Sequence, residues 1–366
     1  MTWQRAAGIA ILVGSGLLAL TAAWPQASPT AAPAPVPLRF EDALERAATD
    51  LFSKANLPGG SDKIELVIDP LIDGVTAAQS VATHAMEKRI VELVRHSYPR
   101  FGIAPFSGEV LARSPVVLVG TFTAVNNAGV ADAPRDAYRI CLALADLRSK
   151  SILSKGVARA KPDGIDVTPT PAFADSPVWA ADAATESYIK TCQGTKPGDP
   201  INPLYAERIR SAALVSDGIL EYDAKRYREA LAFYRIALRM PGGDQLRVRN
   251  GIYLANWRLN RREDATDSFG NVVDYSLSTK KLSVRFLFRP GSTQFLDDQQ
   301  ITAPYSMWLS QIASHAVERG VCLEIVGHTS PTGPASVNER LSFLRAQFIK
   351  DLLQSSDRRL ADRLTA

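Results

Sequence analysis

The chain has 366 residues, of which 46% are hydrophobic and 22% are charged. This length and composition are typical of two or three globular domains and exclude a wholly disordered chain. The formal net charge of +4 is spread along the sequence without a run of five or six like charges, so we expect no nucleic-acid partner.

The first elements that the sequence predicts are an export signal and a spacer. An apolar run over residues 6–24 follows one cation, Arg5, and is about as long as a bilayer core is thick. Cleavage as a signal peptide after Thr21-Ala22-Ala23 and retention as an inner-membrane anchor both remain open. In either case we expect a location in the periplasm or cell envelope. Residues 25–37 are rich in Ala and Pro and predict a semi-stiff linker.

Export would place three cysteines in a compartment where disulfides persist. Since three is an odd number, one thiol must stay free. Cys322 lies in an apolar strand pattern and is expected to be a small core residue, whereas Cys141 and Cys192 can pair if their regions touch.

Residues 38–160 predict an α/β sheet domain. Apolar positions at helical spacing indicate helices over residues 40–56 and 77–96, and apolar runs indicate strands over residues 64–68, 102–106, 116–125 and 137–147. The order of these elements and the strand at residues 116–122 resemble the TolB amino-terminal and curli-secretion-type domains of envelope proteins. Residues 161–204 are rich in Pro and are predicted to be an ordered connector that Trp179 and Tyr188 pin to a neighbour.

Residues 205–280 contain an internal repeat with an offset of 35 residues, seen when Ala230 and Tyr234 are laid over Ala265 and Phe269. The first unit, which also contains Gly218, resembles the tetratricopeptide repeat. The second unit is more degenerate. Because two units fall short of the roughly three that stand alone, we expect flanking elements to cap them. The surface implies a protein partner, with a helical spacer as the equal alternative.

Residues 281–366 predict a strand at 282–288, a helix at 305–319, a strand at 322–327 and a helix that ends near residue 353. The segments 326–333, 338–342 and 345–346 are similar to the signature of the OmpA-like peptidoglycan-binding domain. That family closes its sheet with a further strand after the last helix. Here the expected closing motif does not follow residue 353, so we expect a domain that lacks its last strand.

The resemblance implies a ligand site in the last helix and the loop before it. By motif position Arg345 is the family's arginine, Ser330 stands where the family has an aspartate, and the family's site holds the diaminopimelate unit of the peptidoglycan stem peptide. From the residues themselves, Ser336 and Glu339 predict a capping box at the helix start. Asn338 and Arg345 share one helix side, and we expect a buried stripe beside them. Its members are Leu341, Leu344, Phe348 and Leu352.

A serine in place of an aspartate offers the ligand's ammonium group only a neutral hydrogen bond, roughly 1 kcal/mol weaker or more. The sequence contains no nucleophile, phosphate-loop or metal motif that holds up, so we expect no enzyme activity, no metal and no cofactor.

These features together predict an α+β multidomain protein with an N-terminal α/β sheet domain, a central α-helical repeat pair and a C-terminal OmpA-like βαβα domain. The predicted function is non-catalytic binding of peptidoglycan through Ser330, Asn338 and Arg345, and of an envelope protein through the repeats. The alternative is a periplasmic scaffold that does not bind the cell wall.

Overall fold

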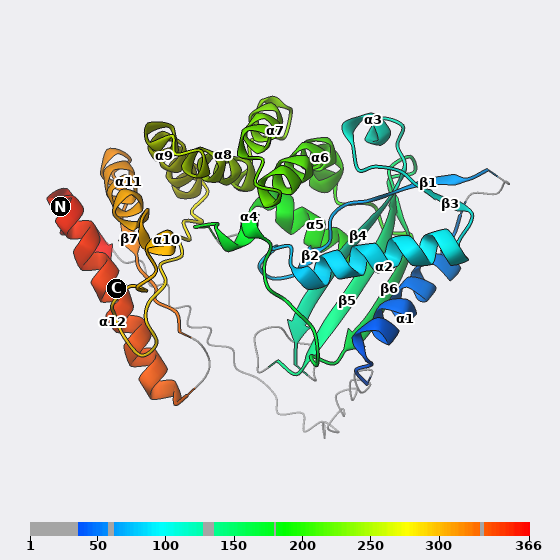
Figure 1. Ribbon diagram of the computed structural model, residues 1–366, viewed down its shortest axis with the longest axis horizontal. Helices are drawn as coiled ribbons and strands as arrows, with labels where there is room; N and C mark the ends of the chain where they lie inside the picture. The colour runs from blue at the N-terminus through cyan, green and yellow to red at the C-terminus, as the bar shows by residue number, and fades with distance from the viewer. Residues whose placement is uncertain (1–35, 58–61, 127–134, 179–180, 330–332) are drawn as a thin grey trace, which may run out of the picture. The chain divides into compact units, whose positions relative to one another are not determined.

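The first layer of the fold is a mixed β-sheet (Figure 1). The computed structural model describes residues 36–57, 62–126, 135–178, 181–329 and 333–366. Within them six strands form one sheet, in which β3, β1 and β4 run parallel, β4, β5 and β6 run antiparallel, and β2 pairs with β4. The strands are β1 (Ile64–Ile68), β2 (Ile72–Asp73), β3 (Phe101–Ile103), β4 (Val116–Val125), β5 (Ala137–Asp146) and β6 (Ser151–Ala160).

Helices cover both faces of this sheet, which explains why β4 is buried along nearly its whole length. One face carries α1 (Phe40–Ser53) and α2 (Val81–Ser97). The other face packs against α3 (Gly108–Leu111), α5 (Ala183–Gln193) and α6 (Pro203–Asp223). A Cβ on Gly156 of β6 would lie 1.8 Å from the carbonyl oxygen of Ala47, so α1 rests directly on the strand backbone.

The Pro-rich connector is ordered where it is described. It contains α4 (Pro171–Ala174) and α5, and its Tyr188 is pinned to the sheet as the sequence predicts. The Tyr188 hydroxyl accepts a hydrogen bond from the Gly120 amide at 2.8 Å and lies 3.0 Å from the carbonyl oxygen of Pro70. Trp179 lies outside the described residues.

Two helical hairpins follow, as the internal repeat predicts. The first consists of α6 and α7 (Tyr227–Arg239), and the second of α8 (Leu246–Arg258) and α9 (Arg262–Ser278). Close approach depends on small residues, because a Cβ on Gly218 would lie 2.7 Å from the ring of Tyr234. Gly251 of α8 meets the same ring, so Tyr234 packs against glycines of two helices. The expected cap on the far side is α11 (Tyr305–Glu318), which packs on α9.

The C-terminal region differs from its prediction in its strands. Residues 282–288 form no strand among the described residues and contribute only isolated bridges, Val178 with Val284 and Phe288 with Phe295. The predicted strand at 322–327 shrinks to β7 (Leu323–Glu324). A short strand does follow the last helix, because β8 (Leu364–Thr365) pairs parallel with β7. The region is completed by α10 (Gln299–Thr302), α12 (Ala335–Ser356) and a 3₁₀ turn (Arg358–Leu360).

One hydrophobic core runs through the helical hairpins and into the C-terminal region. It joins Tyr253 and Phe269 of the second hairpin to Trp308 of α11 and Leu353 of α12. The Trp308 indole donates a hydrogen bond to the Tyr253 hydroxyl at 2.7 Å, inside this core. The two regions are therefore packed together rather than tethered.

The cysteines are placed differently from one another. Cys141 and Cys192 are buried side by side, as the sequence allows, whereas Cys322 is exposed, so its prediction as a core residue is wrong. Its neighbours Val321 and Leu323 point toward the core and Cys322 alternates away from them.

The predicted leader at residues 6–24 lies outside the described residues, and no described helix is both long and apolar enough to span a bilayer.

Candidate functional site

Arg345 lies in the third turn of α12 and is held by a tight loop of the C-terminal region. Its Nε donates to the carbonyl oxygen of Ser292 at 3.0 Å, and its Nη2 donates to that of Arg289 at 3.0 Å. The guanidinium carbon also lies 4.9 Å from the centroid of the Phe288 ring. The arginine is thus fixed by neutral groups, two carbonyl oxygens and a ring face.

No carboxylate among the described residues lies within ion-pair distance of Arg345. Partial burial alone lowers its pKa from the usual range, since no acid is close enough to raise it. A guanidinium stays charged under such a shift. The site therefore presents a positioned positive charge that the described protein does not neutralise.

The loop that holds Arg345 is built by a hairpin-like turn. The Arg289 amide donates to the carbonyl oxygen of Gln294 at 2.9 Å, and Gly291 adopts φ +65°, a conformation that favours glycine. Arg289 forms an ion pair with Asp297, which lies beyond the turn. Because the turn aims two carbonyls at one point, it forms a fixed seat for the guanidinium.

An aromatic cluster packs against the turn that holds Arg345. The ring centroids of Phe288, Phe295 and Phe348 lie within 6.3 Å of one another, with Phe348 edge to face against the other two, and Phe295 contacts Tyr305 of α11. Such contacts order side chains that the turn alone would leave free. The position of Arg345 thus follows from the packing of α11 against α12.

The start of α12 differs from the prediction. The helix begins at Ala335 with Pro334 as its N-cap, and no side chain caps it, so the predicted capping box of Ser336 and Glu339 is wrong. Proline supplies the fixed φ that a helix start requires, which moves the start toward the loop. Arg345 is consequently about 15 Å from the first residue by helical rise and does not lie at the helix mouth.

Asn338 occupies the first helical turn of α12 and is half-buried. It shares a helix side with Arg345, as predicted, at a separation of seven residues. Ser330, the third predicted ligand residue, lies outside the described residues. The structure therefore places two of the three residues on one helix and leaves the third untested.

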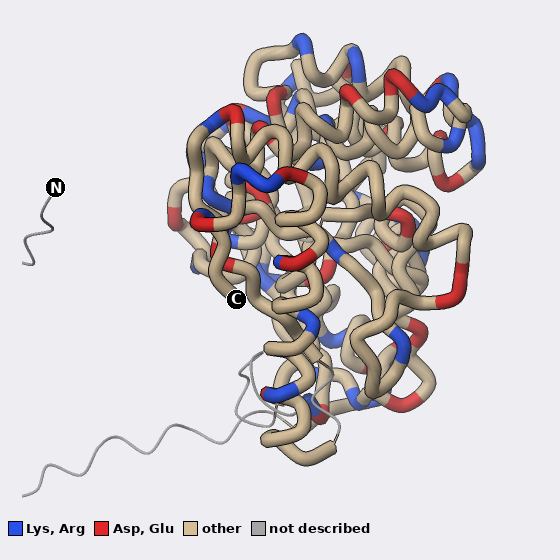
Figure 2. The backbone as a smooth tube through the Cα atoms, turned by 90° about the vertical axis from the view of Figure 1, so that its left-hand side faces the viewer, with Lys and Arg blue, Asp and Glu red and all other residues tan. Residues whose placement is uncertain are grey.

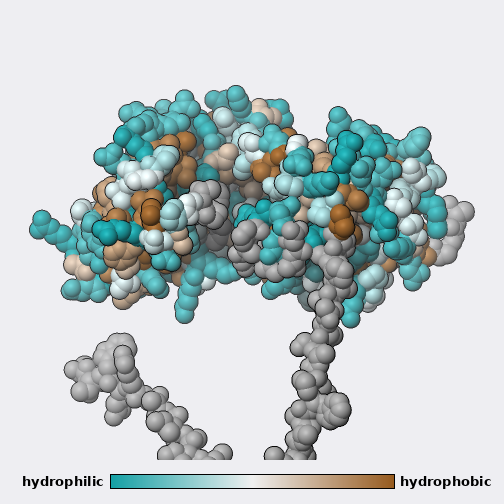
Figure 3. All heavy atoms as spheres, turned by 90° about the horizontal axis from the view of Figure 1, so that it is seen from below, coloured by the Kyte–Doolittle hydropathy of each residue, from teal (hydrophilic) through white to brown (hydrophobic). Residues whose placement is uncertain are grey.

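The buried face of α12 is rotated from the predicted stripe. The buried residues are Ala346, Ile349 and Leu353, whereas Leu344 is 41% exposed. The large apolar side chains that are exposed in the C-terminal region are Ile301, Val326, Val337, Phe343 and Leu344. On the face drawn in Figure 3, apolar atoms form small patches among hydrophilic ones. Arg345 adjoins the buried face, as expected for a residue at the core margin.

Two acids with raised pKa values, the buried Asp69 and the half-buried Glu87, were not predicted from the sequence. Burial raises the pKa of Asp69 to about 7, although its carboxylate accepts a hydrogen bond from Tyr205 at 2.8 Å. Burial also raises the pKa of Glu87 to about 7, and Asp69 adds to the shift. Each acid stands beside apolar residues in the sequence, but no local motif marks either one as buried.

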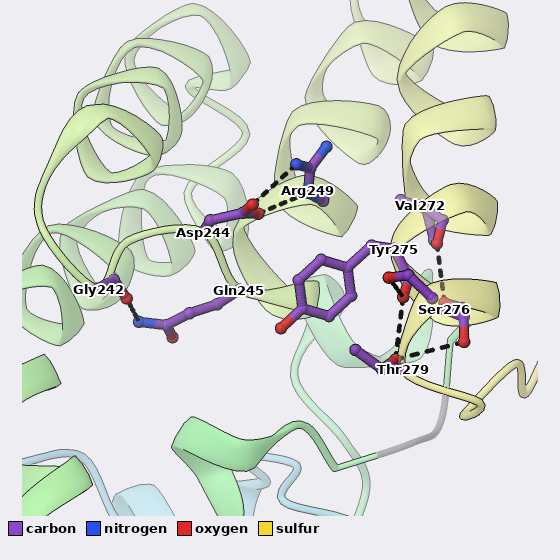
Figure 4. A network of polar contacts seen from close by, with 9 residues as sticks. Gly242, Asp244, Gln245, Arg249, Val272, Tyr275, Ser276 and Thr279 are labelled. Atoms are coloured by element: carbon purple, nitrogen blue, oxygen red, sulfur yellow. Dashed lines mark hydrogen bonds and ion pairs between the residues drawn. The ribbon is translucent and has the colours of Figure 1, made fainter.

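The loop between the two hairpins carries a polar network (Figure 4). Asp244 binds Arg249 through two hydrogen bonds of 2.6 and 3.0 Å, and the Gln245 amide donates to the carbonyl oxygen of Gly242 at 2.7 Å. Arg249 also lies 5.6 Å from the ring centroid of Tyr275 on α9. These contacts fix α8 against α9 and order the loop that precedes α8.

Basic and acidic residues are interspersed over the described part of the chain (Figure 2). No group of three or more acids, histidines or cysteines among the described residues is arranged to hold a metal ion.

In comparisons with protein-family models, with curated proteins and with solved structures, none matches the chain.

Proposed function

We propose that this protein is a non-catalytic cell-envelope protein that binds a carboxylate of the peptidoglycan stem peptide through Arg345. The observation that supports the proposal is a guanidinium seated by two carbonyls and a ring, without a carboxylate partner among the described residues. Nη1 makes no described hydrogen bond and remains the donor for a ligand oxygen. One charge-assisted contact of this kind is worth about 1.5–3 kcal/mol.

The stem peptide fits this site by its chemistry. It offers free carboxylates beside an ammonium group, so Arg345 would take the anion and, by the resemblance to the family signature, Ser330 would take the cation. The serine hydroxyl is neutral, so binding is expected to be weaker than with an aspartate at that position. The helical hairpins would then present the wall-bound protein to an envelope partner.

The test is co-sedimentation of the full chain with insoluble peptidoglycan, because the C-terminal region shares its hydrophobic core with the hairpins. Arg345→Ala should lose retention and Ser330→Asp should increase it. Arg340→Ala removes an exposed arginine of the same helix and should leave retention unchanged. Arg345→Lys keeps the charge and should retain part of the binding.

A second measurement separates binding from a folding defect at Arg345. A soluble stem peptide is compared with its carboxyl-amidated form, by calorimetry, on the native chain and on Arg345→Ala. Amidation should weaken binding to the native chain about tenfold or more and should not weaken binding to the variant. Equal losses in both proteins would contradict the proposal.

The alternative, a scaffold that does not bind the wall, draws support from the exposed apolar side chains Val337, Phe343 and Leu344 on α12. Such side chains suit a protein contact. Absence of retention for the native chain and for Ser330→Asp alike would favour this alternative.

A further inference from the structure

A cavity of about 110 Å³ lies away from Arg345, where the sheet meets the helical hairpins. Asp69 follows β1, Asp182 precedes α5, and Arg247 and Asn250 belong to α8, and all four line the cavity. Its volume is several times the roughly 10–15 Å³ that one water needs. Apolar side chains such as Ile219 and Leu254 complete the lining.

Asn250 offers this cavity an acceptor whose orientation is fixed. The Ser176 hydroxyl has one proton, which it donates to the carbonyl oxygen of Val178 at 2.9 Å. The atom of Asn250 that faces Ser176 at 3.0 Å must therefore be the amide nitrogen. Its Oδ1 is buried and has no hydrogen-bond partner among the described residues, and Asn250 as a whole is only 9% exposed.

Asp182 offers a second acceptor, and this one is charged. Its Oδ1 caps α5 by accepting from the Thr185 amide at 2.9 Å and from the Thr185 hydroxyl at 3.0 Å. Its Oδ2 has no hydrogen-bond partner among the described residues, in a residue that is 4% exposed. Because a buried carboxylate oxygen without a partner is costly, the site is suited to a ligand that donates.

Arg247 supplies the opposite charge. Its Nε donates to Oε1 of Gln245 at 2.7 Å, which orients the guanidinium, and its charge acts on the buried carboxylate of Asp69. No carboxylate among the described residues lies within ion-pair distance of Arg247. Two terminal nitrogens are thus left to meet an anion.

We propose that this cavity binds a small free amino acid. The ligand's ammonium group donates to Oδ2 of Asp182 and Oδ1 of Asn250, and its carboxylate meets the terminal nitrogens of Arg247. A zwitterion satisfies both charged ends at once, whereas water neutralises neither. A short side chain fits the remaining volume against Ile219 and Leu254. The inference does not depend on wall binding, since the two sites share no residue.

The test is a thermal-shift and calorimetric screen of the full chain against free L-amino acids with short side chains. Each hit is compared with its N-acetylated form and with the corresponding amine that lacks the carboxylate. Either change should weaken binding about tenfold or more. If the amine bound as tightly as the amino acid, the ligand would not be a zwitterion. If no amino acid bound at a concentration of about 10 mM, the proposed binding site would be wrong.

Two variants keep the fold while they alter the site. Asp182→Asn preserves the oxygen that caps α5 but replaces Oδ2 with a donor, and Arg247→Gln removes the cation. Both variants should no longer bind the amino acid identified in the screen, and their urea unfolding midpoints should stay close to that of the native chain. The matched controls are Asp163→Asn and Arg210→Gln, which change exposed residues and should bind normally. Unchanged affinity in both site variants would overturn the proposal.

Discussion

The Sγ atoms of Cys141 on β5 and Cys192 on α5 lie 2.9 Å apart inside the core. Each thiol also lies 3.0 Å from the other residue's carbonyl oxygen, so the two residues face one another directly. Burial raises the pKa of the Cys192 thiol well above its usual range, whereas the hydrogen bond from Cys192 lowers the pKa of the Cys141 thiol, so Cys141 is the thiol that loses its proton first.

We expect these two thiols to join when the chain is exposed to a small-molecule disulfide at alkaline pH. Exchange forms the Cys141–Cys192 bond, reduces the reagent to its thiols and releases no other group. A crosslink across 51 positions should stabilise the fold by on the order of 4 kcal/mol on the chain-entropy model. Peptide mapping and urea unfolding measure both effects.

The background for this experiment is Cys322→Ser, which removes the exposed thiol and its intermolecular crosslinks. Cys141→Ser in that background should gain no stability from the reagent. If the reagent leaves the free-thiol count and the urea midpoint of the Cys322→Ser chain unchanged, the expectation is wrong.

Glu87 should make the protein less stable as the pH rises. Its folded pKa of about 7 lies above the ordinary glutamate value of 4.5, so the folded state holds more protons than the unfolded state between these pH values. The free energy of unfolding then falls with rising pH across this window, by up to about 1.4 kcal/mol per pH unit for each such carboxyl. Asp69, whose pKa is also raised to about 7, acts in the same direction.

In the native protein the Leu71 amide donates a hydrogen bond to the Glu87 carboxylate at 2.6 Å. Glu87→Gln keeps an oxygen that can accept this hydrogen bond but removes the titrating group. We expect the slope of stability between pH 5 and pH 7 to fall to roughly half that of the native chain, because Asp69 remains. Urea unfolding at several pH values measures it. Glu45→Gln, at an exposed position, should keep the native slope; an unaltered slope in Glu87→Gln would refute the account.

Gly218→Ala should destabilise the first helical hairpin. The added Cβ would lie 2.7 Å from the ring of Tyr234, which also packs against Gly251 of α8. Overpacking of this kind costs about 1–3 kcal/mol, more than alanine gains in helix propensity. The control is Gly108→Ala, where a Cβ meets nothing within 4 Å. Equal urea midpoints for the two variants would show that the ring can move aside.

Side-chain periodicity predicted most helices and the long strands β4 and β5, because it reports burial, whereas the equally long β6 was not predicted. It failed where strand formation depends on a partner. Residues 282–288 alternate in the manner of a strand, and Val284, Phe286 and Phe288 do pack against the core. Their backbone, however, meets only single residues of other segments. A pattern of side chains cannot show whether a second strand lies within hydrogen-bonding distance.

The candidate site was only partly predicted, again because a pattern along the sequence does not show which segments pack together in the fold. The signature located Arg345, but α12 carries two adjacent apolar stripes, and only its packing against α11 and the last turn selects the one with Ile349 and Leu353. The cavity was not predicted, because Asp182 and Asn250 are 68 positions apart in the sequence and meet only in the fold. Isolated polar residues carry no local signal of such a meeting.

The shared core of hairpins and C-terminal region also has a mechanical consequence. A load applied at Arg345 passes from the Phe288 ring through Phe295 and Tyr305 to Trp308, and from Trp308 through Tyr253 into the second hairpin. A force on Arg345 would therefore reach the hairpins through packed side chains of one shared core, and not through a flexible linker.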